Sequence, residues 1–125
     1  MSARSVFIAA ALALCSLTQA AEKPETTGAG PKPLKGEYWI YGGELGDTVP
    51  PTKKNMKVAF TFKGPLAKEL FDQIGPDRKD TCGAGPDRRI RFRRDLACIW
   101  DKGDGYVCYF GLDVPTGKST YGSIC

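Results

Sequence analysis

The chain of 125 residues contains no histidine. Without an imidazole it cannot use Ser-His or Cys-His nucleophilic catalysis, and it lacks the usual general base near neutral pH. The sequence also lacks a Cys-x-x-Cys pair, which argues against a structural zinc site and against a dithiol redox centre. We therefore expect no cofactor, no metal ion and no catalytic residue.

Long apolar runs are missing after the first twenty residues, so we expect no transmembrane segment in the mature chain. At the start, residues 6–14 are all apolar and Arg4 is the only nearby charge. Residues 18–20 then place small side chains at positions −3 and −1 of a cleavage site. This arrangement is typical of a secretory signal peptide over residues 1–20.

A lipoprotein signal that ends at Cys15 is the alternative to simple cleavage. It fits less well, because Leu14 is bulky for the position before a lipidated cysteine. We expect a periplasmic or secreted protein, cleaved near Ala20, and the alanine-rich start resembles bacterial signals.

Residues 21–36 contain three prolines, three glycines and few apolar side chains. Such a segment buries too little surface to offset its ordering entropy, and we expect a flexible leader. The remaining residues, 37–125, form a single small domain whose core is marginal without cross-links. Loss of Arg4 with the signal peptide leaves a net charge of +3, which is too small to indicate nucleic acid.

Four cysteines lie in the last third of the chain: Cys82, Cys98, Cys108 and Cys125. An even set in a short exported chain indicates disulfides and an oxidising compartment. Four cysteines allow three pairings, and the sequence alone does not choose between them. We favour Cys82–Cys98 with Cys108–Cys125; a Cys98–Cys108 bridge between neighbouring strands is the alternative.

The first half of the domain predicts two strands and a helix. Residues 37–41 are aromatic and β-prone, and residues 56–62 alternate between apolar and polar side chains. A long loop over residues 42–54 joins them. In the helix, Pro65 suits the first position, and Leu66, Leu70 and Ile74 form one apolar stripe before Gly75 and Pro76 end it.

The second half, from Ile90 to Cys125, predicts a three-stranded antiparallel meander. Its strands are residues 90–100, 106–114 and 118–124, joined by glycine-containing turns. If Trp100 pairs with Tyr106, Cys98 lies opposite Cys108. The predicted fold class is therefore α+β: one short helix on a small antiparallel sheet, with the meander held by two disulfides.

The strongest charge feature is the run from Arg88 to Arg94. Arg89, Arg91 and Arg93 alternate with Ile90 and Phe92, which predicts a strand with an outer arginine face and an inward apolar face. On this interpretation all three arginines can be replaced together with little effect on folding. The hypothetical anion-binding set comprises Arg78, Lys79, Arg88, Arg89, Arg91, Arg93 and Arg94, because guanidinium groups bind phosphate and carboxylate well. A solvated strand face that prevents edge pairing is the alternative.

We expect a non-catalytic envelope protein, monomeric, that binds an acidic protein or an anionic polymer or lipid through these arginines. A secreted inhibitor or immunity-type protein against a cell-wall hydrolase or another envelope enzyme is the alternative. A carboxylate-based hydrolase is the third hypothesis, with Glu37, Glu44, Asp47, Asp101 and Asp104 as the acids at hand. Asp101 and Asp104 lie in a glycine-rich turn, where aspartate usually serves the turn itself.

Overall fold

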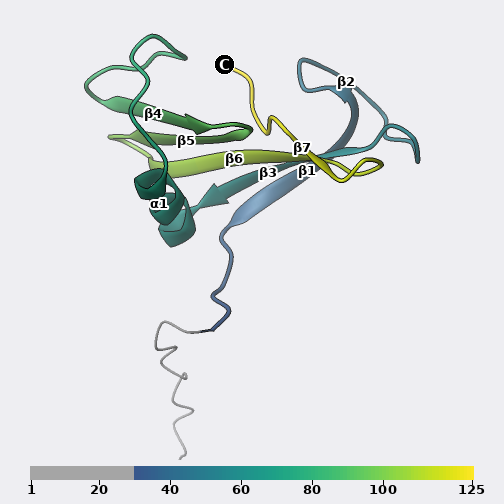
Figure 1. Ribbon diagram of the computed structural model, residues 1–125, viewed down its shortest axis with the longest axis horizontal. Coiled ribbons are helices and arrows are strands. Elements are labelled where there is room, and N and C mark those ends of the chain that lie inside the picture. The colour runs from purple at the N-terminus through teal and green to yellow at the C-terminus, as the bar shows by residue number, and fades with distance from the viewer. Residues whose placement is uncertain (1–29) are drawn as a thin grey trace, which may run out of the picture. The chain divides into compact units, whose positions relative to one another are not determined.

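The computed structural model describes residues 30–125, in which seven strands form one antiparallel sheet (Figure 1). The predicted signal peptide and most of the predicted leader lie outside the described residues. The strands run in the spatial order β2-β1-β3-β6-β5-β4, and β7 pairs with the end of β6. Their bounds are Gly36–Glu44 (β1), Asp47–Val49 (β2), Lys57–Lys63 (β3), Arg88–Arg93 (β4), Leu96–Asp101 (β5), Gly105–Asp113 (β6) and Lys118–Thr120 (β7).

One helix, α1 (Gly64–Gln73), follows β3 directly, with proline in its first turn as the sequence predicts. Its apolar stripe packs on the sheet, where Ala67 and Phe71 are completely buried. Ile74 joins them, and the buried disulfide cysteines of β5 and β6 complete this core. Within residues 30–125, no helix is long and apolar enough to cross a membrane.

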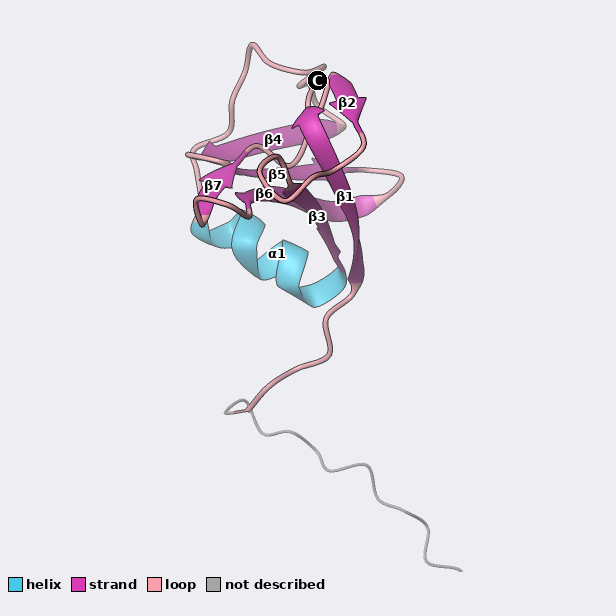
Figure 2. Cartoon of the chain, turned by 90° about the vertical axis from the view of Figure 1, so that its right-hand side faces the viewer, coloured by secondary structure: helices cyan, strands magenta, loops and turns pink. Residues whose placement is uncertain are grey.

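The two faces of the sheet are covered by different parts of the chain. α1 lies on one face, and the C-terminal end of the chain lies on the other (Figure 2). A helix of ten residues is only about 15 Å long, at about 1.5 Å per residue. It therefore covers part of its face, where it packs on β6, β5 and β3.

The predicted class, one helix on an antiparallel sheet, is confirmed, but the sheet is larger than expected. The predicted first meander strand, residues 90–100, is in fact two strands, because the chain turns at Arg94, whose φ is 53°. The predicted third strand ends at Thr120, and the predicted loop over residues 42–54 contains the short strand β2.

Both disulfides form, but with a different pairing from the one favoured above. The bridges are Cys82–Cys125 and Cys98–Cys108, so the pairing of Cys82 with Cys98 and of Cys108 with Cys125 was wrong. The register of β5 and β6 explains the second bridge: Trp100 lies opposite Tyr106, which places Cys98 opposite Cys108. That register and the cross-strand alternative are both confirmed.

Candidate functional site: the two edges of the sheet

The arginines of β4 share one face of the strand, as the sequence predicts, but it is the face that α1 covers. Arg91 lies opposite Cys98 in the β4–β5 register, and residues directly opposite each other point to the same side of a sheet. Only 18% of the Arg91 side chain is exposed. Ile90 is fully buried, but on the opposite face. The predicted outer arginine face is therefore wrong for Arg91.

Asp77 occupies the space between two of these arginines. Arg89 Nε donates to Asp77 Oδ2 at 2.7 Å, and Arg91 Nε donates to Asp77 Oδ1 at 2.6 Å. The hydrogen bond from Arg89, followed by that from Arg91, lowers the pKa of Asp77. The same contact with Asp77 raises the pKa of Arg89. These two arginines are therefore engaged within the fold.

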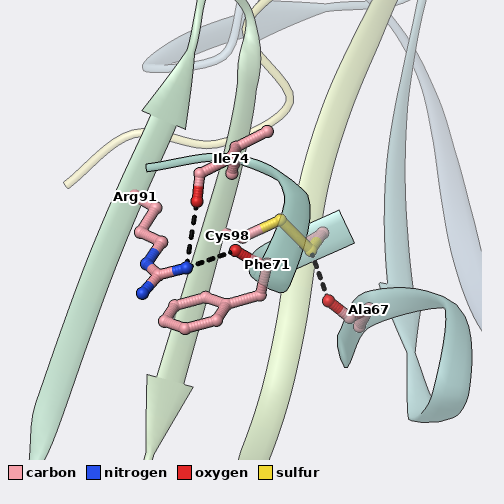
Figure 3. The surroundings of a disulfide bond; sticks show 6 residues. Ala67, Phe71, Ile74, Arg91 and Cys98 are labelled. Atoms are coloured by element: carbon pink, nitrogen blue, oxygen red, sulfur yellow. Dashed lines mark hydrogen bonds between the residues drawn. A yellow bond between two sulfur atoms is a disulfide. The ribbon is translucent and has the colours of Figure 1, made fainter. Parts of the chain in front are cut away.

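Arg91 also closes the end of α1 (Figure 3). Its NH1 group donates to the carbonyl oxygens of Phe71 and Ile74, at 2.8 and 3.0 Å. The guanidinium carbon lies 4.2 Å from the centre of the Phe71 ring, as expected of a cation–π contact. α1 has no basic residue in its own last turn, so Arg91 supplies donors that the helix end otherwise lacks.

The Cys98–Cys108 bridge lies directly beneath this helix end, and both cysteines are completely buried. Cys108 Sγ lies 3.3 Å from the carbonyl oxygen of Ala67, and a dashed line to Ala67 marks this contact in Figure 3. A bridged sulfur has no proton to donate, so we interpret this approach as a packing contact. Arg91 and the bridge together attach α1 to the sheet.

Four basic residues near β4 remain available for a ligand. Arg78, Lys79, Arg93 and Arg94 are exposed, and among residues 30–125 none of them forms an ion pair with a carboxylate. We call these four residues the basic strip. Arg88, also predicted as a ligand, lies 3.3 Å from Asp101 instead.

The basic strip follows the outer edge of β4. The Arg78 N–H donates to the Ile90 carbonyl at 2.7 Å. This bond holds the segment around Arg78, which precedes β4 in the sequence, against the outer edge of β4. Arg93 is the last residue of β4, about 10 Å from the level of Ile90 at about 3.3 Å per residue, and Arg94 follows it in the turn. Arg78 lies opposite Ile90, whereas Arg93 lies on the face of Arg91, so the basic strip borders both faces of the sheet at this edge.

At the opposite end of the sheet, the outer edge of β1 is only partly paired. β2 pairs with Gly42–Glu44, and within the described part of the chain no strand lies beside Gly36–Tyr41 on that side. The Lys63 N–H donates to the Lys35 carbonyl at 2.9 Å.

This bond fixes which backbone groups of β1 are free. In an antiparallel pair, opposite residues alternate between hydrogen-bonded and non-hydrogen-bonded pairs. Since Lys35 and Lys63 bond directly, Trp39 and Tyr41 bond to β3 as well. The N–H and C=O groups of Tyr38 and Ile40 therefore point away from the sheet.

The side chains at this edge are large, apolar and exposed. The exposed fractions are 69% for Tyr38, 51% for Trp39 and 40% for Ile40. On the same face as Tyr38, Phe60 is only half-buried and does not belong to the core cluster beneath α1. The sequence analysis did not identify this surface; its signal was three consecutive bulky residues in a strand, without a polar position between them.

Three cavities lie near acids that the sequence analysis named. One, about 800 Å³, lies between the start of α1 and the β5–β6 turn and is lined by Asp104. Two others, about 150 and 310 Å³, are lined by Glu37. A further cavity, about 310 Å³, lies beside the Cys82–Cys125 bridge and is lined by no Asp or Glu side chain. Asp101 accepts a hydrogen bond from the Gly103 N–H within its turn. Among residues 30–125, no group of three His, Cys, Asp or Glu side chains could hold a metal ion.

Comparison with protein-family models, with curated proteins and with solved structures finds no match for this chain, so its function has to be inferred from these two edges.

Proposed function

We propose that this protein is a non-catalytic binding protein of the bacterial envelope, and that the basic strip binds an anionic polymer or lipid. The observation that carries the proposal is the difference between the arginines of this region. Arg88 pairs with Asp101, and Arg89 and Arg91 share Asp77, whereas the four cations of the strip have no carboxylate partner among residues 30–125.

The chemistry of the strip fits phosphate or carboxylate ligands. Three of its four members are arginines, whose planar fork binds either group through two parallel hydrogen bonds. The four side chains are solvent-exposed, so binding does not require opening of the fold. Exposed charges are screened by salt, and binding should weaken as ionic strength rises.

The test is a variant in which Arg78, Lys79, Arg93 and Arg94 are all replaced by Gln. The matched control replaces Lys35, Lys53, Lys54 and Lys118, four exposed lysines elsewhere, so both variants lose the same charge. Retention on a heparin column and co-sedimentation with phosphatidylglycerol vesicles are measured against salt. We expect the strip variant to elute at much lower salt and to lose vesicle binding, and the control to lose little.

Equal losses in the two variants would show that only net charge matters, and would refute a defined binding strip. Unchanged retention of the strip variant would refute the proposal altogether. Both variants should unfold like the wild type, since exposed substitutions usually change stability by about 0.5 kcal/mol or less.

A further inference from the structure

We infer that the free edge of β1 is a self-association site, where β1 pairs with β1 of a second copy of the chain in antiparallel orientation. The two-fold axis passes beside Tyr38. This surface lies at the other end of the sheet from the basic strip, so the inference is independent of the proposed anion binding.

The free edge of β1 lacks the features that normally prevent strand pairing. Proteins protect edge strands with charges, prolines, bulges or a covering segment. β4 has such protection, because the segment at Arg78 is bonded to it and arginines line it. On the free part of β1 the only charged side chain is Glu37, which lies next to Lys63 at 3.5 Å.

The free stretch of β1 also has a length that suits pairing with the same stretch of a second copy. The free stretch begins at Gly36, the first residue of β1. It ends before Gly42, because β2 pairs with β1 from Gly42 onward. Two copies related by a two-fold axis at Tyr38 place Gly36 of one opposite Ile40 of the other. All the free N–H and C=O groups between these limits then find a partner.

The position of Glu37 also favours an axis at Tyr38 over an axis at Glu37, one residue earlier. With the axis at Tyr38, Glu37 of one copy lies opposite Trp39 of the other, and no like charges meet. A shift that places the axis at Glu37 sets two carboxylates directly opposite each other, which is unfavourable. A shift to Trp39 brings Gly36 opposite Gly42, whose edge β2 already occupies.

On the face shared with α1, the same register gives a packed row of side chains. Tyr38 lies opposite Tyr38 at the centre, and each Ile40 lies opposite a glycine that leaves room for the tyrosine rings. Aromatic and β-branched neighbours of this kind stabilise a strand pair. The pairing also covers the exposed parts of Tyr38 and Trp39.

The buried area predicts a weak dimer. Tyr38 and Trp39 are about half to two-thirds exposed, so each offers on the order of 100–150 Å². The exposed parts of Leu34 and Ile40 add to this area. The total area that each copy can bury still remains below the roughly 800 Å² per partner of a standard interface. We therefore expect dimers at high protein concentration, or where export and surface binding concentrate the chain.

The experiment is sedimentation equilibrium of the processed protein from micromolar to millimolar concentration. We expect a reversible monomer–dimer equilibrium. Tyr38→Lys should abolish the dimer, because the axis sets the two lysines against each other. Tyr121→Lys is the matched control, since Tyr121 is 64% exposed and lies outside β1; it should dimerise like the wild type.

A cross-linking arm tests the register. Hydrogen-bonded antiparallel residues have Cα atoms about 5.5 Å apart, within the range of a disulfide. With oxidised glutathione as the oxidant, Tyr38→Cys should form an intermolecular bridge at position 38, mapped by mass spectrometry. Ile40→Cys should not, because the two copies of that residue are about 13 Å apart along the strands.

A monomer at every concentration would overturn the inference. Dimers that survive Tyr38→Lys, or that cross-link as readily through position 40 as through position 38, would also overturn it, because another surface or register would then be responsible.

Discussion

The half of the sheet around β4 and β5 and the half around β1 and β2 are stabilised very differently. α1, the Cys98–Cys108 bridge and the arginine pairs with Asp77 all lie in the first half. The ion pairs near β1, Glu37 with Lys63 and Glu44 with Lys57, involve largely exposed carboxylates and are worth little. The difference indicates that the helix, the buried bridge and the least exposed ion pair of the domain are concentrated in one half of the sheet.

The two edges show the same contrast. Along β4, positive charge and the segment at Arg78 prevent the addition of another strand. Along β1, Tyr38 and Ile40 present free backbone groups beside apolar side chains. A basic edge suits an anionic ligand in water, whereas an apolar edge with free hydrogen-bonding groups suits another strand.

The largest expected effect tests how much a disulfide bridge contributes to the stability of the domain. Cys82→Ala combined with Cys125→Ala opens a bridge that spans 43 residues, and chain entropy predicts a loss of about 4 kcal/mol. Urea unfolding measures it. Mild reductant should also open this bridge first, because Cys125 is exposed whereas Cys98 and Cys108 are completely buried. Loss of the buried bridge first would contradict the arrangement.

The next effect separates two arginines of the same strand. Arg91→Met leaves the Phe71 and Ile74 carbonyls without their donor and removes one of the two arginines that bind Asp77. Hydrogen bonds to charged groups contribute about 1.5–3 kcal/mol, and we expect a loss of that size. Arg93→Met, at an exposed position, should cost about 0.5 kcal/mol or less. Equal thermal unfolding of the two variants would restore the interpretation of β4 as a solvated arginine face.

A smaller effect concerns pH. Because the contacts with Arg89 and Arg91 lower the pKa of Asp77, the ion pair contributes stability above the unfolded pKa, which is about 4. That contribution disappears as pH falls through the lower folded value. Asp77→Asn should therefore flatten the acid side of the stability curve, measured by urea unfolding between about pH 5 and pH 2. Asp104→Asn, in an exposed turn, serves as the control and should leave the curve unchanged.

Local patterns account for what the sequence predicted correctly. Proline in the first turn and the spacing of Leu66, Leu70 and Ile74 specify α1, because these signals act within one helix. Alternation around the β5–β6 turn gave the register that joins Cys98 to Cys108. The helix and this hairpin follow from neighbouring residues, whereas the presence of two disulfides follows from the set of four cysteines.

Features that depend on distant residues were missed. The turn at Arg94 contains neither glycine nor proline, so nothing local separates β4 from β5. Cys82 and Cys125 meet only once the sheet and its C-terminal end are in place. Arg91 was predicted to face solvent. Its hydrogen bonds to the carbonyls at the end of α1 depend on where the helix packs on the sheet, which the residues around Arg91 do not show.

The smallest effect leaves stability unchanged and tests the free edge directly. At low concentration, amide hydrogen exchange by NMR should alternate along β1. The Trp39 and Tyr41 amides, which bond to β3, should exchange slowly, whereas those of Tyr38 and Ile40 should exchange fast. Raising the protein concentration should slow the exchange of Tyr38 and Ile40 selectively, because the second copy then accepts their hydrogen bonds. Fast exchange of both amides at every concentration would leave β1 an open edge without a partner copy. Slow exchange of both at low concentration would mean that a segment of the same chain covers the edge, and the contrast between the two edges would then disappear.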